Sequence, residues 1–347
     1  MKKGILWNSC ALLFAIWLCQ LYSCKKAPSN KPPKTKSRKV LKQKKPLRTR
    51  VPTIRKAKKK KPLAKSSRKK WHWHTLQKGV EYAVLDLKKE VQMGTGQIHF
   101  VRIQNLHKGL TSSAASEFGQ KKQTARQWAK DRGYSIVVNA GMFKKDHSSN
   151  VGYFRKGKHI NSKTWNAKYL SVLTISNSRF HLPTTRRLKP HEYPGGRIFD
   201  LQSPGRGSSQ RYARKFKKFW TVIQNLRLIK SQGKRIKKGV GVWSKRTKNR
   251  KWSEVALAMD KYGNLLFVFS RSPFSMWAFN KLLLSLPLDI IRAMHLEGGP
   301  EASLSIHTKK LTLDLSGSYE TNFNENDNNK EQWPIPNVLG VLAPHSP

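Results

Sequence analysis

The sequence predicts an α+β domain with a mixed central β-sheet and flanking helices, formed as a single domain by residues 71–347. Three observations favour this fold class. Short stretches of alternating or continuous apolar residues recur as strands, and two segments have helical spacing. Turn signals such as DKYGN (260–264) indicate antiparallel pairing in place of strict βαβ repetition. The 347 residues are 37% hydrophobic and include 11 Trp, which is enough for a sizeable core.

The first 24 residues have the pattern of an export signal. A pair of lysines precedes an apolar run at 10–21. The run is shorter than a membrane-spanning helix requires, and it leads into Leu-Tyr-Ser-Cys at 21–24. This ending resembles a bacterial lipobox, so we expect a signal peptide at 1–23 and a lipid on Cys24. A plain cleaved signal or a short anchor is the alternative. The other two cysteines lie in the removed segment, which leaves no disulfide to form.

A strongly basic segment follows the signal. Residues 25–70 hold 22 Lys or Arg and no Asp or Glu. Such a segment has too few apolar side chains to bury, so folding would not offset the loss of conformational entropy. We therefore expect a lipidated Cys and a disordered linker over 24–70. Of the formal net charge of +52, the first 70 residues carry +24, which leaves +28 on the rest.

The charge restricts the partners that the protein can have. In the cytosol such a tail would indicate nucleic acid, but the export signal argues against it. Outside the cytosol the polyanions are phospholipid head groups, phosphorylated glycans and other anionic envelope polymers. A solvated spacer that merely stays near the membrane is an equally reasonable interpretation. We expect a phosphorylated glycan or an anionic envelope polymer, and no nucleic acid.

The elements of the domain follow from periodicity. Strand patterns occur at 80–89, 96–105, 134–143, 169–176, 225–230, 255–260, 264–271 and 292–298. Helical spacing occurs at 124–133, which stops at a glycine, and at 277–286. The polar stretch at 324–332 is expected to be a loop.

The stretch HLEGGPEASL (295–304) carries the clearest chemical signal. Glu297 and Glu301 flank a Gly-Gly-Pro turn, and two carboxyl groups in one cleft can supply a general acid together with a base or nucleophile. Gly298 and Gly299 allow close approach to a ligand, and their N–H groups can bind phosphate. His295 is suited to proton transfer. A tight turn with a surface acid and a structural histidine is the alternative.

Six segments in order resemble the phosphodiester glycosidase family. They are VVNAGMF (137–143), SNVGYFRKGKHIN (149–161), VIQNLRLIKSQGK (222–234), the stretch 255–279, HLEGGPEASL (295–304) and PNVLGVLA (336–343). The resemblance extends from about residue 81 to 343. Three positions depart from the family pattern: Glu297 replaces an Asp, Pro300-Glu301-Ala302 replaces a serine-containing turn, and Glu254-Val255 replaces an Arg-Thr pair.

The resemblance implies an exported hydrolase that cleaves a sugar 1-phosphodiester in an envelope or extracellular glycan. Glu297 is the expected acid/base carboxylate, with Glu301 and His295 as catalytic partners. The expected substrate ligands are Asn139, Gly141, Gly298, Gly299 and Ser303. No cofactor is expected and no segment has zinc-ligand spacing, although a divalent metal is left open. The alternative is a non-catalytic lipoprotein that binds anionic cell-envelope polymer.

Overall fold

A computed structural model describes residues 72–87, 93–105, 107, 109–176, 195–202, 207–232 and 239–344. The chain divides into two units, 1–65 and 66–347, and the second holds all of the described residues. The expected signal peptide, the lipidated Cys24 and the basic linker lie outside them. None of the helices in the described ranges is long and apolar enough to cross a membrane.

The larger of the two sheets is antiparallel throughout its described pairings. Its main path runs β1 (His74–Gln77), β2 (Val80–Asp86), β3 (Gln97–Ile103), β13 (Leu265–Phe274), β12 (Trp252–Asp260), β14 (Ile290–Gly298), β10 (Thr221–Ser231), β6 (Phe154–Lys156) and β7 (His159–Ser162). Off this path, β11 (Gly239–Gly241) and β8 (Ser171–Ile175) pair with β10, and β9 (Gly196–Asp200) pairs with β8.

A second, smaller sheet is also antiparallel. Its order is β16 (Thr312–Ser316), β15 (Ser303–His307), β5 (Tyr134–Asn139), β17 (Asn337–Leu342) and β4 (Leu110–Ala114). The connection from β14 of the large sheet to β15 of the small one is the 3₁₀ turn η3 (Gly299–Glu301). The Gly-Gly-Pro stretch is therefore the point where the chain changes sheets.

The two sheets pack face to face around the main core. Side chains alternate along a strand, so β12 sends Val255 and Leu257 toward the small sheet and Ala256 and Ala258 to the opposite face. The inward residues join the apolar residues of β5 and β15 in one buried cluster. The alanines leave room for a helix on the outer face of the large sheet.

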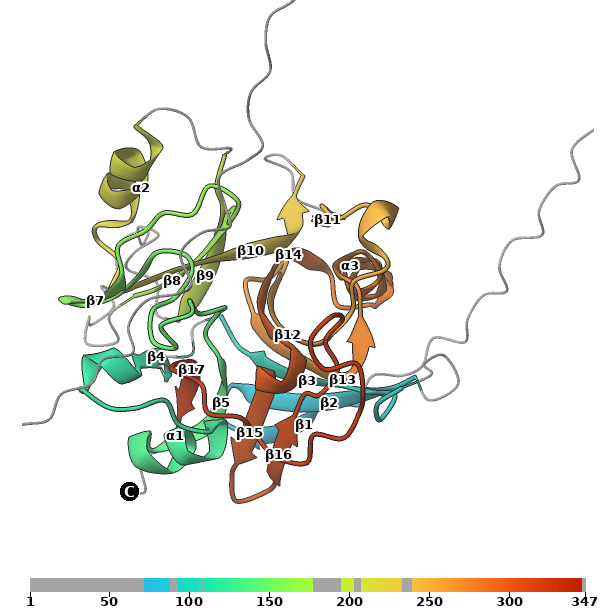
Figure 1. The fold of residues 1–347 in the computed structure, drawn as a ribbon. Coiled ribbons are helices and arrows are strands. Elements are labelled where there is room, and N and C mark those ends of the chain that lie inside the picture. Colours follow the sequence, from blue (N-terminus) through green and yellow to red (C-terminus); the bar gives the residue numbers. More distant parts are fainter. Residues whose placement is uncertain are drawn as a thin grey trace, which may run out of the picture. The chain divides into compact units, whose positions relative to one another are not determined.

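Three α-helices cover the sheets. Helix α3 (Met276–Ser285) packs Phe279 and Leu283 against the alanine face of β12 and lies next to β11 (Figure 1). Helix α1 (Ala125–Arg132) buries Trp128 against the outer face of the small sheet. Its Thr124–Gln127 capping box and the left-handed Gly133 fix its two ends. Helix α2 (Ser208–Phe216) covers β8 and β10.

The expected mixed sheet is wrong, because every described strand pairing is antiparallel. The fold is a mostly β structure of two packed sheets with three helices. The eight strand segments and both helices that periodicity predicted are present. The strands β1, β4, β6, β7, β9, β11, β15, β16 and β17 and the helix α2 were not predicted from periodicity.

Candidate active site

The main cavity of the described residues lies on the α3 side of the large sheet and has a volume of about 540 Å³. This size suits a small ligand or a sugar unit. Its walls come from β14, β12, β10, the start of α3, the loop before β12 and the segment after β16. The lining residues are Met142, Leu226, Trp243, Arg246, Thr247, Asn249, Arg250, Trp252, Met276, His295, Glu297, Gly298 and Glu320.

Strand β14 supplies the reactive side chains of this cavity. Met294 and Leu296 belong to the core between the sheets, so the alternating residues His295 and Glu297 face the other way, into the cavity. Between Val255 and Ala256 of β12 the paired residue shifts from Glu297 to His295, which leaves Leu296 as the extra residue of a bulge. Bulges of this kind re-aim side chains next to active sites.

His295 forms a pair with a carboxylate below the cavity. Its Nδ1 lies 2.7 Å from Oε2 of Glu254 on the neighbouring strand β12. Glu254 is 0% exposed, and this burial raises the pKa of its carboxyl while His295 opposes the shift. Because Nδ1 is engaged by Glu254, the ring can turn only Nε2 toward the cavity. Glu254 and His295 thus form a carboxylate–imidazole dyad in which Nε2 is the nitrogen available to a ligand.

Glu297 is a buried acid whose surroundings favour its protonated form. It is 9% exposed, and burial raises its pKa well above its usual range. The charge of Glu301 adds to this rise, while the Gly298 N–H, 3.1 Å from Oε1, opposes it. The charge of Glu297 in turn contributes to the raised pKa of Tyr169, about 12, although burial is the larger cause. Glu297 can therefore donate a proton at a pH where an ordinary glutamate is ionised.

A second carboxyl group lines the cavity from the segment after β16, that of Glu320. Oε1 of Glu320 accepts a hydrogen bond from the Trp252 indole at 3.3 Å, and burial raises the pKa of Glu320. Gly299 makes room for it: this residue has φ +68°, and a Cβ there would collide with the Glu320 carboxyl. The approach of the Glu320 carboxyl therefore requires a glycine at position 299, two residues after the predicted acid Glu297.

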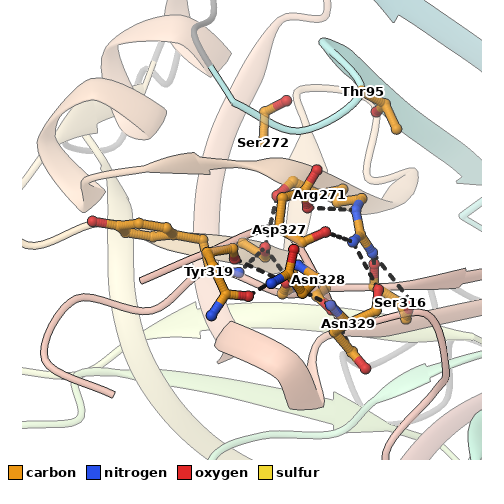
Figure 2. A network of polar contacts seen from close by, with 12 residues as sticks. Thr95, Arg271, Ser272, Ser316, Tyr319, Asp327, Asn328 and Asn329 are labelled. Carbon is orange, nitrogen blue, oxygen red and sulfur yellow. Dashed lines mark hydrogen bonds and ion pairs between the residues drawn. The ribbon is translucent and has the colours of Figure 1, made fainter. Parts of the chain in front are cut away.

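The segment that carries Glu320 is tied down by Arg271 of β13. Its guanidinium forms an ion pair with Asp327 at 2.7 Å and donates to the backbone carbonyls of Ser316, Asp327 and Asn329 (Figure 2). We call residues 317–332 the strap. The polar stretch expected to be a loop is part of this strap, and Arg271 is one of the residues that hold it in place.

Two of the expected substrate ligands instead build the turn that follows β14. Asn139 is 1% exposed, and its side chain donates to the Glu301 carbonyl at 2.8 Å and accepts from the Ser303 N–H at 2.8 Å. The Ser303 hydroxyl donates to the same carbonyl at 3.1 Å. Both polar groups of Asn139 are therefore used in joining β5 to the turn. Neither residue lines the cavity.

Of the remaining predicted residues, some line the cavity and others do not. Gly298 lines the cavity, whereas Gly141 does not, and a Cβ at Gly141 would collide with Asn225. Glu301 is half-buried and not among the lining residues, yet its charge acts on Glu297. Of the three predicted catalytic residues, the structure brings His295 and Glu297 into one cavity, with Glu301 nearby.

Several site residues were not predicted from the sequence. Glu254 appeared only as a departure from a family pattern, and Glu320 lies in a polar stretch without periodicity. Arg246 and Arg250 belong to a basic loop that gave no specific signal, and Trp243 directly precedes that loop. Their contribution depends on the packing of strands far apart in the sequence. Within the described residues, no cluster of three His, Cys, Asp or Glu side chains could hold a metal ion.

Comparison with known proteins identifies one family. A family model described as phosphodiester glycosidase matches residues 132–342. Among solved structures, the catalytic domain of zebrafish N-acetylglucosamine-1-phosphodiester alpha-N-acetylglucosaminidase, auto-inhibited by its pro-peptide, is similar with a TM-score of 0.50 and 12% identity. The similarity covers 78% of this chain and 86% of that one, and it concerns the fold alone.

Two further structures are more distant. A hypothetical protein from Synechocystis has a TM-score of 0.47 and 14% identity, over 78% of this chain and 63% of that one. A Burkholderia pseudomallei K96243 protein described as exported has a TM-score of 0.37 and 11% identity, over 71% and 74%. These two similarities are too weak to carry an argument. No curated protein is significantly similar to this chain in sequence.

Proposed function

This chain belongs to the phosphodiester glycosidase family, and on that premise we propose that its main cavity hydrolyses a sugar 1-phosphodiester. The bond cleaved is the one between the anomeric carbon and the phosphate oxygen. The observation that carries this proposal is the pairing, in one cavity, of a buried acid with a raised pKa and a histidine held by a buried carboxylate. A buried acid beside a histidine that a carboxylate orients can supply the acid and the base of a general acid–base site.

Glu297 acts as the general acid. Its raised pKa favours the protonated form of the carboxyl, and the residue lines the cavity. It donates that proton to the phosphate oxygen that leaves the anomeric carbon. The expected contribution of such a group is about 10²- to 10⁴-fold in rate. Glu301 supports this role through its negative charge, which adds to the pKa rise of Glu297.

His295 acts as the general base, with Glu254 as its positioning residue. We assign the Nδ1 proton to the hydrogen bond with Glu254, which leaves the Nε2 lone pair for the cavity. Nε2 takes a proton from water as the water oxygen bonds to the anomeric carbon. The carbon–oxygen bond to phosphate breaks, and its electron pair stays with the phosphate. The buried Glu254 then stabilises the imidazolium that has formed.

The cavity also suits the two halves of the substrate. Trp243 and Trp252 offer apolar surface to a sugar ring, and Glu320 offers an acceptor for its hydroxyl groups. Arg246 and Arg250 offer positive charge to the phosphate. Glu297 and His295 both lie on β14, so the sugar binds with its anomeric carbon toward that strand.

The proposal includes the place where the enzyme works. The signal pattern and Cys24 support an exported lipoprotein in the cell envelope, and the basic residues 25–70 support an anionic glycan as its partner and not nucleic acid. Intact-mass analysis of the protein from bacterial membranes should find an acylated Cys24 at the mature N-terminus. An unprocessed Met1 in the cytosol would contradict this part of the proposal.

The direct test uses an aryl phosphodiester of N-acetylglucosamine 1-phosphate with the full chain. The wild-type protein should release free sugar, and Glu297→Gln should lose about 10²- to 10⁴-fold in kcat/KM. Glu81→Gln is a matched control, because Glu81 pairs with Arg102 on β2 and β3 and does not line the cavity. Binding of an anionic glycan without turnover by any variant would favour the alternative, a non-catalytic binding lipoprotein.

A further inference from the structure

We propose that the substrate is a polymer with repeating phosphodiesters and that a basic loop beside the cavity holds the phosphates next to the one being cleaved. The loop comprises residues 244–251, and we call it the basic loop. The inference rests on the proposed function, since it names the class of substrate that the same site takes. It assigns the loop a role in recognising units that lie outside the cavity.

The basic loop is unusually rich in unbalanced charge. It contains Lys245, Arg246, Lys248, Arg250 and Lys251 within eight residues, and all five side chains are exposed. Among the described residues, none of them forms an ion pair with a carboxylate. The sequence around the loop adds to this imbalance, because residues 201–253 contain 17 Lys or Arg and no Asp or Glu.

The loop has a defined conformation that positions these charges. The 3₁₀ turn η2 (Lys245–Thr247) occupies its first part, and the Thr247 hydroxyl donates to the Ser244 carbonyl at 2.8 Å. Before the loop, the Trp243 indole donates to the Arg227 carbonyl of β10 at 2.8 Å. At its end, the Lys251 N–H donates to the Thr321 hydroxyl of the strap at 2.9 Å. The loop is thus attached to two walls of the cavity.

The cations are distributed in a way that one phosphate does not explain. Arg246 and Arg250 line the cavity and can hold the phosphate that is being cleaved. Lys245, Lys248 and Lys251 are outside the lining but on the same loop. A substrate with a single phosphodiester leaves these three lysines without a ligand. A polymer that continues from the cavity across the loop supplies each of them with a neighbouring phosphate.

The test compares substrates that differ only in length. The probes are methyl N-acetylglucosaminyl phosphodiester, with one phosphate, and a synthetic oligomer of N-acetylglucosamine units joined by four 1,6-phosphodiesters. At low salt the wild-type full chain should cleave the oligomer with kcat/KM about tenfold or more above the single unit. The preference should fall as salt is raised toward 0.5 M, since screening shortens the reach of exposed charges.

A triple substitution locates the effect. In Lys245→Ser/Lys248→Ser/Lys251→Ser the ratio of the two kcat/KM values should fall close to one. The matched control removes an equal charge from α2 and the residues after it, with Arg214→Ser/Lys215→Ser/Lys217→Ser. These three residues are exposed and do not line the cavity, so the ratio should keep its wild-type value.

The outcomes separate this inference from the function on which it rests. No cleavage of either probe overturns the proposed function. Cleavage of both probes with equal kcat/KM, or an oligomer preference that the triple variant retains, overturns the polymer assignment alone. Binding to phosphatidylglycerol vesicles through the three lysines, without an oligomer preference, would assign the loop to a membrane surface and also overturn it.

Discussion

Removing the charge of Glu254 gives the most informative single perturbation. Glu254→Gln keeps the shape of the side chain, and its amide oxygen can still accept the hydrogen bond from Nδ1 of His295. The change removes only the negative charge behind the imidazole. Because Glu254 is 0% exposed and burial raises its pKa, a neutral amide costs less to bury than the carboxylate. The fold should therefore survive the substitution.

The expected loss of activity follows from the geometry of the dyad. One hydrogen bond of 2.7 Å links the carboxylate to the ring that becomes cationic in the reaction. Hydrogen bonds to charged groups contribute about 1.5–3 kcal/mol. Since 1.36 kcal/mol corresponds to a factor of ten in rate, kcat should fall roughly 10- to 150-fold. KM should change little, because the stabilised charge is absent from the ground state.

The assay measures kcat, KM and the melting temperature of the wild type, Glu254→Gln and Glu81→Gln. A lower kcat for Glu254→Gln with a melting temperature within a few degrees of wild type agrees with a positioning role. A kcat equal to that of wild type would refute the dyad, whatever happened to KM.

The other predictions concern the acid, the strap and the core. The pKa of Glu297 is raised in the folded protein, so its contribution to stability is present below the usual glutamate pKa and is lost as pH rises through the raised value. Glu297→Gln should therefore melt higher than wild type at pH 8 and show no such gain near pH 4; a gain that is the same at both pH values would contradict the assignment. Wild-type activity should fall at high pH as Glu297 ionises, and a profile that keeps rising would oppose its role as acid. Arg271→Ala removes the contacts that hold the strap, so it should cost about 1–3 kcal/mol and lower kcat/KM, with Arg271→Lys restoring only part of both in denaturant and kinetic measurements. Gly299→Ala should lower kcat/KM, because the new Cβ displaces Glu320 and the residue has φ +68°; unchanged kinetics would show that Glu320 is not needed there. Trp128→Ala should destabilise the domain by about 3–5 kcal/mol in chemical denaturation, and a loss below 1 kcal/mol would mean that α1 does not close the core.

The local elements of this fold could be predicted from sequence because their signals are local. Apolar runs such as 134–143 and 264–271 become strands, and the Thr124–Gln127 capping box begins α1 as helical spacing predicts. Periodicity says where a strand lies but not which strand lies beside it. The expected mixed sheet was wrong for this reason: strands that follow one another in sequence are placed in two sheets with antiparallel neighbours.

The candidate site was predictable only where the residues lie on one strand. His295 and Glu297 are two residues apart on β14, so alternation places them on one face. Glu254 reaches His295 through the pairing of two strands, from 41 residues away in the sequence. Glu320 reaches the cavity through the strap. Asn139 was assigned to substrate because it ends a strand beside a glycine, yet its amide is used in the turn that carries Glu301.

The most direct measurement asks which bond the cavity breaks. Methyl N-acetylglucosaminyl phosphodiester is hydrolysed by the full chain in H₂¹⁸O, and the two products are analysed by mass spectrometry. The account predicts ¹⁸O in the released sugar and none in methyl phosphate, because water attacks the anomeric carbon, and it predicts that Glu297→Gln abolishes most of the product. Label in methyl phosphate would mean attack at phosphorus and would contradict the assignment of the cavity to a glycosidase.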